Sequence, residues 1–282
     1  MPDISGPIVN FEQVSVTFDE TSALRNVSFK LNPGETHIIL GAAGSGKTTL
    51  LKAVIGLVRI DEGEIKLFGQ SITSLTEHDL YPLRSHIGML FQEGGLFDSL
   101  SVGDNVEYPL LNQQTANGQN GKGQPGEESS SIETHARDAL RFVELEQTFD
   151  KFPSELSGGM RRRVGIARAI VTEPPLVLYD SPTAGLDPIT ANTIMALILK
   201  ERDVSNTASL IVTHRFQDGD LMADFRYDPK HQELIHLPEH DEARNRTRFI
   251  VMKEGEIVFF GTRAELASSS DEYVKRFVKH EE

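Results

Sequence analysis

The chain has 282 residues, with 42 acidic and 28 basic side chains and a formal net charge of −14. This length suffices for one large α/β domain with a subdomain, and the acidity opposes nonspecific nucleic-acid binding, which relies on cationic contacts with phosphate. The absence of cysteine excludes disulfides, the first residues do not suggest a signal peptide, and no apolar run approaches the roughly 20 residues that span a bilayer.

The first part of the chain, residues 8–35, reads as β-strands that end in a turn. Val14, Val16 and Phe18 alternate along one of these expected strands. That alternation would turn Phe18 toward a core, so its sequence position alone does not make it a ligand-binding residue.

A glycine-rich loop follows from Gly41 to Thr48, with the spacing G-x-x-x-x-G-K-[ST]. The apolar residues 36–40 predict a buried strand before it, and the spacing of residues 47–57 predicts a helix after it. Strand, loop and helix in this order are typical of a phosphate loop, although a plain glycine-rich turn is the alternative. The residues expected around the phosphates are Gly41, Gly44, Ser45, Gly46, Lys47, Thr48 and Thr49.

Two side chains of this loop have the chemistry for specific roles. Lys47 would reach the β- and γ-phosphates of a nucleotide, and the Thr48 hydroxyl would bind Mg²⁺. The expected cofactors are therefore ATP and Mg²⁺.

The next apolar strand, residues 87–91, leads to Gln92, and from residue 93 to about 165 the pattern is helical. Within this part, residues 112–131 are rich in Gly, Gln, Asn and Ser. Such low complexity predicts a flexible insertion that need not bind anything.

The sequence Leu-Ser-Gly-Gly-Met at residues 156–160 precedes three arginines and an apolar helix. Ser157 suits the N-cap of that helix, and Pro153 and Glu155 before it suit a turn. The arginines at positions 161–163 have two readings that remain equally open: contact with a nearby phosphate, or a solvated helix face.

A buried strand at residues 176–179 delivers Asp180 at its carboxyl end, where open α/β sheets bind ligands. Together with Lys47, this position predicts the second half of the Mg²⁺ site. Ser181 follows it directly, and a further apolar strand ends at His214.

The last third of the chain returns to alternating strands and helices, interrupted by an insertion at residues 226–247. This insertion carries His231, His236 and His240 among acidic residues, a spacing that matches no strong metal motif, so a charged surface hairpin or loop is favoured. Residues 253–258 predict a hairpin, and the tail from residue 263 to 282 is expected to be helical.

These motifs occur in one fixed order, and as a set they resemble those of the ABC ATPases over most of residues 8–262. The resemblance implies an α/β fold: a RecA-like P-loop NTPase core with an antiparallel β subdomain and an inserted α-helical signature subdomain. The expected parts are residues 1–92 and 166–262 for the ATP-binding core, residues 93–165 for the signature subdomain, and residues 263–282 for a C-terminal tail.

The same resemblance implies a head-to-tail dimer in which each ATP lies between the phosphate loop of one subunit and the signature of the other. Ser157, Gly158 and Gly159 would then donate hydrogen bonds to the γ-phosphate. A homodimer is the expected form.

The resemblance also assigns roles to single residues. Gln92 would sense Mg²⁺ and the attacking water, His214 would contact the γ-phosphate, and Asp187 would couple the two sites. Phe18 matches the aromatic loop on which adenine stacks, a reading that competes with its core-facing alternation.

Ser181 departs from the family, which usually has glutamate after this aspartate. A serine hydroxyl can position water but cannot accept a proton at neutral pH, so hydrolysis is expected to be slow. Three explanations stay open: another carboxylate such as Glu93 assists, a partner subunit supplies the intact site, or the serine is an engineered trap.

Residues 91–106, Met160 and the Thr-Ala-Gly-Leu-Asp-Pro sequence at 183–188 resemble the Mla-type ATPases of bacterial phospholipid transport. This likeness implies transmembrane permease subunits as partners, which would dock near Gly95–Phe97 and could connect to a lipid-binding substrate protein. The chain would then sit peripherally on the cytoplasmic face of the inner membrane.

Other functions share these motifs. The alternatives are the ATPase of a polar amino-acid or other solute importer, and a degenerate regulatory subunit that binds ATP. ABC ATPases of DNA repair or ribosomes generally fuse two nucleotide domains, and the single motif set and strong acidity argue against that class.

Overall fold

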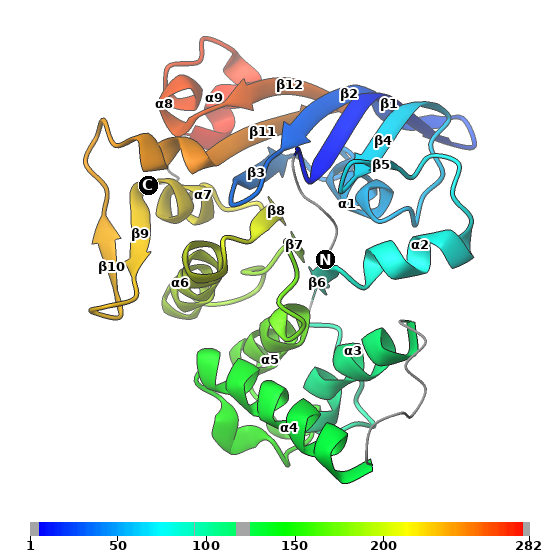
Figure 1. Cartoon of the computed structure of the whole chain (residues 1–282). Coiled ribbons are helices and arrows are strands. Elements are labelled where there is room, and N and C mark those ends of the chain that lie inside the picture. The colour runs from blue at the N-terminus through cyan, green and yellow to red at the C-terminus, as the bar shows by residue number, and fades with distance from the viewer. Residues whose placement is uncertain (1–5, 93, 117–124, 279–282) are drawn as a thin grey trace.

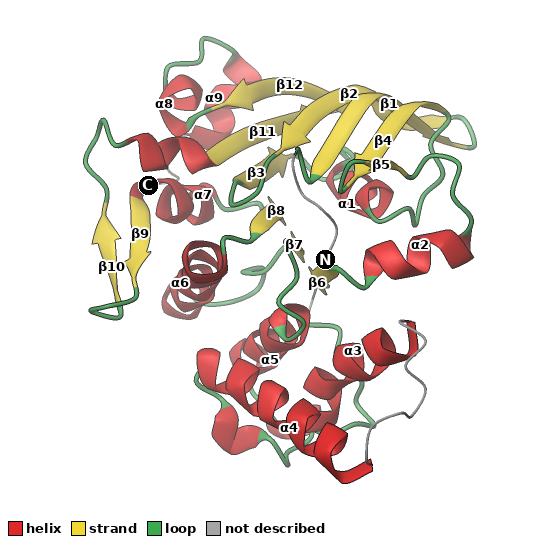
Figure 2. Cartoon of the chain, viewed as in Figure 1, coloured by secondary structure: helices red, strands yellow, loops and turns green. Residues whose placement is uncertain are grey.

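The computed structural model describes residues 6–92, 94–116 and 125–278. The helices α3 (Val102–Ala116), α4 (Pro125–Phe142) and α5 (Gly158–Ile170) gather at one end of the molecule, and the β-sheets with the remaining helices occupy the rest (Figure 1, Figure 2). This arrangement agrees with the expected α/β core and helical subdomain.

The larger sheet of the described residues has six strands, in the order β12-β11-β3-β8-β7-β6. Neighbours run parallel except β11 and β12, which form an antiparallel hairpin at one edge. Strands buried on both faces read as continuous apolar runs, which is why β3, β7 and β8 were recognisable in the sequence. The bounds are β3 (Thr36–Gly41), β6 (Ile87–Leu90), β7 (Leu176–Asp180), β8 (Ala208–Val212), β11 (Thr247–Lys253) and β12 (Glu256–Gly261).

The smaller sheet is antiparallel, in the order β2-β1-β4-β5. Its middle strand pairs on both sides, since Val9 lies opposite Leu31 of one neighbour and Leu67 of the other. This sheet is the expected antiparallel subdomain, and it carries Phe18 at the end of its middle strand. The bounds are β1 (Val9–Phe18), β2 (Thr21–Leu31), β4 (Glu62–Leu67) and β5 (Gln70–Ser71).

Each face of the larger sheet has its own hydrophobic core, because successive side chains of a strand point to opposite faces. Ile39 of β3 belongs to the core shared with the smaller sheet and helix α1 (Lys47–Val54). Ile38 and Leu40 belong to the other core, which extends into the helical subdomain. The phosphate loop at the end of β3 is therefore anchored from both faces.

The helical subdomain shares one hydrophobic core with one face of the larger sheet. Helix α5 runs to Ile170, five residues beyond the expected boundary at residue 165. Within the expected flexible insertion at residues 112–131, the described residues belong to α3 up to Ala116 and to α4 from Pro125. Proline suits the first turn of α4 because the N–H groups of a first turn have no partner within the helix, so the absence of an N–H in proline loses no hydrogen bond.

The remaining helices lie around the larger sheet, and two of them lie beside its β11–β12 edge. Helices α8 and α9 pack together beside the β11–β12 hairpin (Figure 1), so the described part of the tail, up to residue 278, consists mainly of two helices. Among the described residues, no helix is both long and apolar enough to cross a bilayer. The bounds are α2 (Glu77–Arg84), α6 (Pro188–Ser205), α7 (Phe216–Asp224), η3 (Glu242–Arg246), α8 (Arg263–Ala267) and α9 (Glu272–Val278).

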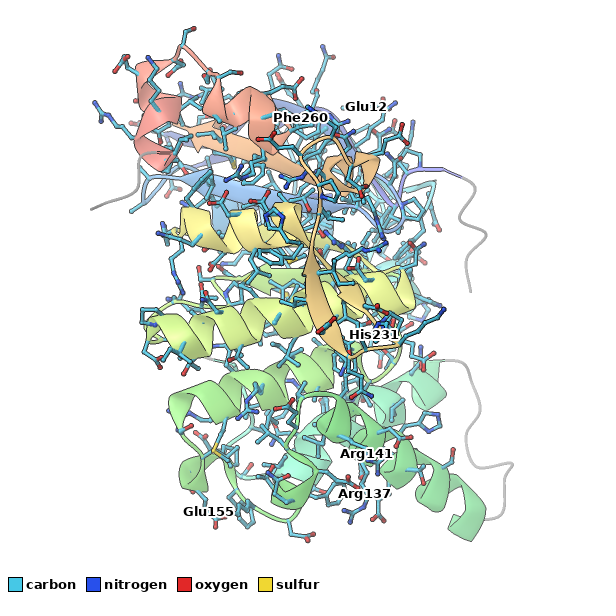
Figure 3. The ribbon with its side chains drawn as sticks, turned by 90° about the vertical axis from the view of Figure 1, so that its left-hand side faces the viewer. Glu12, Arg137, Arg141, Glu155, His231 and Phe260 are labelled. Carbon is cyan, nitrogen blue, oxygen red and sulfur yellow. The ribbon has the colours of Figure 1, made fainter. Side chains whose placement is uncertain are left out.

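The insertion at residues 226–247 contains a hairpin of β9 (Phe225–Asp228) and β10 (Glu233–His236). Figure 3 shows His231 at its tip, where Nδ1 lies 2.7 Å from a carboxylate oxygen of Asp228. The described residues contain no group of three or more histidine, aspartate and glutamate side chains suited to a metal ion. The favoured reading, a charged surface hairpin, fits this geometry.

Candidate functional site

The loop between β3 and α1 is curled and tightly packed against its neighbours. Gly41, Gly44 and Gly46 have φ angles of 154°, 75° and 101°, a region that glycine enters without steric penalty. A Cβ on Gly41 would lie 2.5 Å from the carbonyl oxygen of Met252, and one on Gly46 would lie 2.4 Å from that of Ala23. Glycine is therefore required at both positions, and α1 begins directly after the loop with its free N–H groups toward it.

The ammonium of Lys47 turns back over this loop. Its Nζ donates to the carbonyl oxygens of Gly41 (2.9 Å) and Ala42 (2.7 Å) and to Ser45 Oγ (3.3 Å). Burial lowers the pKa of Lys47, and the negative charge of Asp180 partly opposes this shift. Since its partners are neutral oxygens, a phosphate would offer the ammonium a stronger, charge-assisted bond.

Asp180 and His214 meet Lys47 at the carboxyl end of the larger sheet. Asp180 ends β7 opposite Val212 of β8, and His214 follows β8 by two residues. Burial lowers the pKa of His214, the charge of Lys47 lowers it further, and Asp180 raises it. Burial therefore favours the neutral imidazole, and the three side chains share one electrostatic environment.

Ser181 lies in a sharp turn directly after β7. Its φ is 53°, an unusual value for a residue with a side chain. Its N–H donates to the carbonyl oxygen of Val212 (2.9 Å), and its Oγ donates to Asp180 Oδ1 (3.2 Å). The residue is 7% exposed, so a small hydroxyl occupies a confined position beside the Asp180 carboxylate.

Arg162, the middle one of the three arginines at positions 161–163, is not part of a solvated helix face. Arg161 Nη1 donates to the carbonyl oxygen of Leu156 and Arg163 Nη1 to that of Val143. Arg162 is buried, and it spans the turn after β7 by donating to the carbonyl oxygens of Ser181 (2.7 Å) and Ala184 (3.1 Å). Helix α5 is therefore hydrogen-bonded, through Arg162, to the turn that carries Ser181.

Asp218 of α7 is a buried carboxylate that the sequence analysis missed. Its Oδ2 accepts from the hydroxyls of Thr183 and Thr213, both at 2.6 Å, and Arg215 Nη1 lies 3.8 Å from its other oxygen. Burial raises its pKa despite the two hydroxyl donors. It connects the segment after Ser181 with the segment before His214. Thr183 is 35 positions away, so no local spacing could have revealed the contact.

Phe18 is 50% exposed at the end of β1. The strand pairs with β2 up to this residue, after irregular register between Val14 and Thr17. Those irregularities break the simple alternation that would have turned Phe18 toward the core. An exposed aromatic face is thereby available for stacking.

The signature segment begins α5, and its backbone at Gly159 lies against Thr190 near the start of α6. Ser157 is the N-cap, with Oγ accepting from the N–H of Met160 at 3.2 Å. A Cβ on Gly159 would lie 2.7 Å from Thr190 Cγ2, whereas one on Gly158 would have nothing within 4 Å. Asp187 caps α6 through bonds from Thr190, which lower its pKa. One chain therefore presents an exposed Gly158 that is free to approach another surface.

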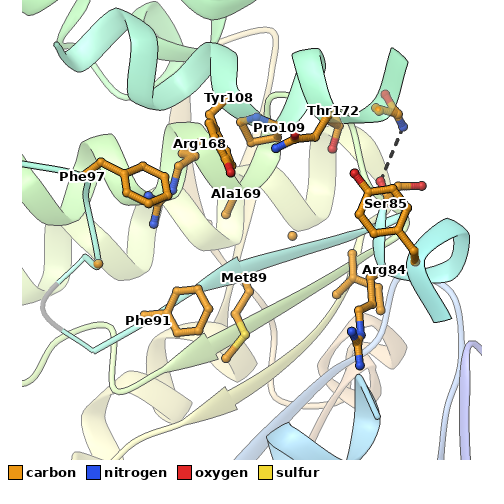
Figure 4. A pocket seen from close by; sticks show the side chains of 16 residues that line it. Arg84, Ser85, Met89, Phe91, Phe97, Tyr108, Pro109, Arg168, Ala169 and Thr172 are labelled. Atoms are coloured by element: carbon orange, nitrogen blue, oxygen red, sulfur yellow. Dashed lines mark hydrogen bonds between the residues drawn. The ribbon is translucent and has the colours of Figure 1, made fainter. Parts of the chain in front are cut away.

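Gln92 is exposed just after β6, and Glu93 lies outside the described residues. Beside this segment is a groove of about 580 Å³ between β6 and the helical subdomain. Figure 4 shows Met89 and Phe91 on one side, with Phe97, Tyr108 and Arg168 on the other. Arg168 Nη2 donates to the carbonyl oxygen of Gly94 (3.0 Å), and burial lowers its pKa.

A P-loop nucleotide-binding α/β domain is the class that this fold and site define. The family model for the ABC transporter matches residues 24–184, more than half of the chain. The chain belongs to this family. Solved relatives share the fold: dimeric MJ0796, an ATP-binding cassette bound to ADP and Pi, aligns with a TM-score of 0.71 and 29% identity over 90% of this chain and 98% of that one. For cbiO1 of Clostridium perfringens, part of the transporter complex cbiONQ, the values are 0.74, 26%, 96% and 92%.

Curated relatives include ATP-binding proteins of different transport systems. The methionine import protein MetN of Rhizobium etli is 37% identical over 213 residues, which cover 74% of this chain and 55% of that protein. The intermembrane phospholipid transport protein MlaF of Haemophilus influenzae is 35% identical over 210 residues, 74% of this chain and 75% of that protein. The chain thus spans about half the length of the methionine import relative and three quarters of the phospholipid one.

Proposed function

We propose that this chain binds and hydrolyses ATP as the nucleotide-binding subunit of an ABC transporter. The observation that carries the proposal is the position of Lys47, Asp180 and His214 at the carboxyl ends of the neighbouring parallel strands β3, β7 and β8, beside a loop that requires glycine at two positions. Lys47 would exchange its loop carbonyls for the β- and γ-phosphates, and neutral His214 would bind the γ-phosphate. The exposed ring of Phe18 would stack on adenine.

The residues present fit Mg²⁺ beside the phosphates. Thr48 at the start of α1 and Asp180 at the end of β7 offer a hydroxyl and a carboxylate, and exposed Gln92 offers an amide oxygen. Oxygen ligands of this kind are those that Mg²⁺ takes in phosphate sites. When bound, the ion neutralises charge that develops on the transferred phosphoryl group.

Two chains in head-to-tail arrangement complete the site in this proposal. Ser157, Gly158 and Gly159 stand at a helix start, and Gly158 has open space where a side chain would be. From there their N–H groups and the Ser157 hydroxyl would reach the γ-phosphate held by a second copy. Support comes from the dimeric ATP-binding cassette of the same fold that holds ADP and Pi.

Ser181 sets the expected rate. A general base typically contributes about 10²–10⁴-fold, whereas positioning and charge stabilisation supply most of phosphoryl-transfer catalysis. The buried Ser181 hydroxyl holds Asp180 and places no base there, so we propose a slow ATPase.

The test is steady-state ATP hydrolysis by wild type, Ser181→Glu and Lys47→Ala. We expect measurable wild-type turnover that Lys47→Ala abolishes and Ser181→Glu raises. The same turnover with glutamate would show that the base lies elsewhere, and turnover only with glutamate would favour a regulatory subunit.

We further propose that membrane permease subunits dock in the groove lined by Phe91, Phe97 and Tyr108, and that the chain lies peripherally on the cytoplasmic face of the inner membrane. The groove is mostly apolar and includes Phe91, the residue before Gln92, so an inserted helix would contact the helical subdomain and lie beside the site. Tyr108→Asp should then release the permease without changing the nucleotide affinity of the isolated chain.

Phospholipid is the substrate we propose, on the likeness to the phospholipid transport protein that this chain matches over three quarters of its length. The likeness to a methionine importer makes an amino acid the second candidate. Reconstitution with the permease encoded beside this chain separates them. Transfer of a fluorescent phospholipid between vesicles supports the first, and uptake of labelled methionine supports the second.

A further inference from the structure

The C-terminal helix α9 brings one tyrosine hydroxyl to the phosphate loop. Tyr273 Oη accepts from the N–H of Ala42 at 3.2 Å and donates to the carbonyl oxygen of Met252 at 3.1 Å. Ala42 is the second residue of the loop, and Met252 lies in β11 opposite Gly41. A single hydroxyl thus joins the first turn of the loop to the neighbouring strand from 231 positions away.

The position of this hydroxyl is well defined by packing. The ring of Tyr273 meets that of Phe277 at 5.2 Å, and Lys253 Nζ lies 5.3 Å from its centroid. Asp271 caps the helix by accepting from the N–H of Tyr273 at 2.7 Å, and the next residue, Val274, is buried. The tyrosine therefore acts on the loop as part of a docked helix.

The Ala42 amide has a special place in the loop. Residues 42–44 are exposed, whereas Gly41 and Ser45 on either side are buried, so the exposed arch is held at its two ends. Lys47 uses the carbonyl oxygen of Ala42, and Tyr273 uses its N–H. Both faces of this one peptide segment are thereby fixed before a ligand arrives.

We infer that Tyr273 is a positioning residue for nucleotide binding. Its hydroxyl keeps the first turn of the phosphate loop in the curled shape, which reduces the ordering that ATP must impose when it binds. The inference rests on the proposed ATP binding and adds the C-terminal helix to the parts of the chain that set nucleotide affinity.

The test compares Tyr273→Phe with wild type, because this change removes the hydroxyl and keeps the packed ring. We expect the Kd for Mg-ATP to rise about 3- to 10-fold, as for the loss of one hydrogen bond between neutral groups. The melting temperature without nucleotide should stay within the range of the control Tyr227→Phe, a tyrosine of β9 remote from the loop. Amide hydrogen exchange of Ala42, followed by NMR, should accelerate in Tyr273→Phe alone.

The outcomes separate this inference from the proposed function. If wild type binds Mg-ATP, Lys47→Ala binds it poorly, and Tyr273→Phe binds as well as wild type or better, the inference is wrong. Unchanged Ala42 exchange would also overturn it, since the hydroxyl would then not hold the amide. If wild type itself fails to bind Mg-ATP, the proposed function falls first and the inference with it.

Discussion

Individual side chains at the site are held by partners far away in sequence. Arg162 of α5 donates a hydrogen bond to the carbonyl oxygen of Ser181. Asp218 of α7 accepts hydrogen bonds from the hydroxyls of Thr183 and Thr213. Because these contacts are buried, each lost partner would leave a polar group without a bond, which is more damaging than the bond itself is stabilising. The site therefore depends on residues that never touch a nucleotide.

Phe18 gives the first prediction at this scale. Phe18→Ala should weaken Mg-ATP binding by about 1–3 kcal/mol, the usual value of stacking a base on an aromatic ring. Its side chain is half exposed, so the fold should be unaffected. Isothermal titration with ATP measures the change, and Phe18→Tyr, which keeps the aromatic face, should bind like wild type. Equal affinity of the alanine and tyrosine variants would remove Phe18 from the site.

Asp218 gives the second. Asp218→Ala leaves the buried hydroxyls of Thr183 and Thr213 without their acceptor, and we expect the free energy of unfolding to fall by about 2–4 kcal/mol. Asp218→Asn keeps an oxygen acceptor in the same volume and should lose clearly less. Urea denaturation of the two variants measures the difference. An alanine variant as stable as the asparagine one would show that the two bonds contribute nothing.

Sequence reasoning located the residues that stand within motifs and missed those that support them. Lys47, Asp180 and His214 could be found because a strand, a loop or a fixed spacing marks each one. Arg162 was seen only as part of a basic cluster, and Asp218 and Tyr273 were not singled out at all. Their roles come from contacts between distant segments, which no local pattern encodes.

At the scale of elements, strand β3 combines the phosphate loop with a buried histidine. His37 is fully buried between the rings of Phe29 and Phe260. Its Nε2 lies 3.7 Å from Glu35 Oε2, too long for a hydrogen bond, and among the described residues neither ring nitrogen has a hydrogen-bond partner. A charge there would be expensive, so the strand is built around a neutral imidazole.

This arrangement predicts how stability depends on pH. Burial lowers the pKa of His37 below its ordinary 6.5, with Arg248 adding to the shift and Glu35 opposing it. As the pH falls below about 6.5, His37 takes up a proton in the unfolded chain but stays neutral in the folded chain. The free energy of unfolding therefore decreases. Urea denaturation between about pH 7 and pH 5 should show this decline, and His37→Phe should flatten it.

Two other titratable groups, His214 and Glu35, also affect how stability depends on pH. His214 also has a lowered pKa and contributes with the same sign, so His37→Phe flattens the profile only in part. Partial burial raises the pKa of Glu35, but the nearby His37 ring and hydrogen bonds from Asn32 lower it overall from 4.5 to about 2, so its contribution is lost only at more acidic pH. An identical decline in wild type and His37→Phe would show that His37 does not titrate as inferred.

Most elements could be predicted because each has a strong local signal. The buried strands read as apolar runs, and Ser157 marks a helix start. Boundaries were less accurate: α5 extends past residue 165, since its apolar face packs on both the helical subdomain and the sheet. The hairpin at residues 225–236 was expected only as one of two surface forms, because its strands are short and partly exposed.

At the scale of the whole molecule, the decisive prediction concerns two chains. Gly158→Arg should fold, because a side chain there meets nothing within 4 Å. The added bulk and charge would occupy the surface that faces the second copy, so Mg-ATP should no longer produce a dimer. Sedimentation of the wild type with Mg-ATP should show the dimer that the variant lacks.

Two measurements make this result specific. The variant should keep nucleotide binding to its own phosphate loop, and Ser270→Arg, which adds the same charge on an exposed segment near the C-terminus, should dimerise like wild type. If Gly158→Arg dimerises normally, the signature does not face the partner's nucleotide in the way we propose.

The hydrogen bonds from Arg162 to the turn after β7 have a consequence for cooperativity between the two ATP sites of the proposed dimer. In the proposed dimer, the first turn of α5 would touch the nucleotide of one site, while Arg162, further along the same helix, holds Ser181 of the other. A rigid helix of 13 residues would then make each site sense whether its neighbour is filled. Turnover by such a pair would rise with ATP concentration more steeply than a single hyperbola.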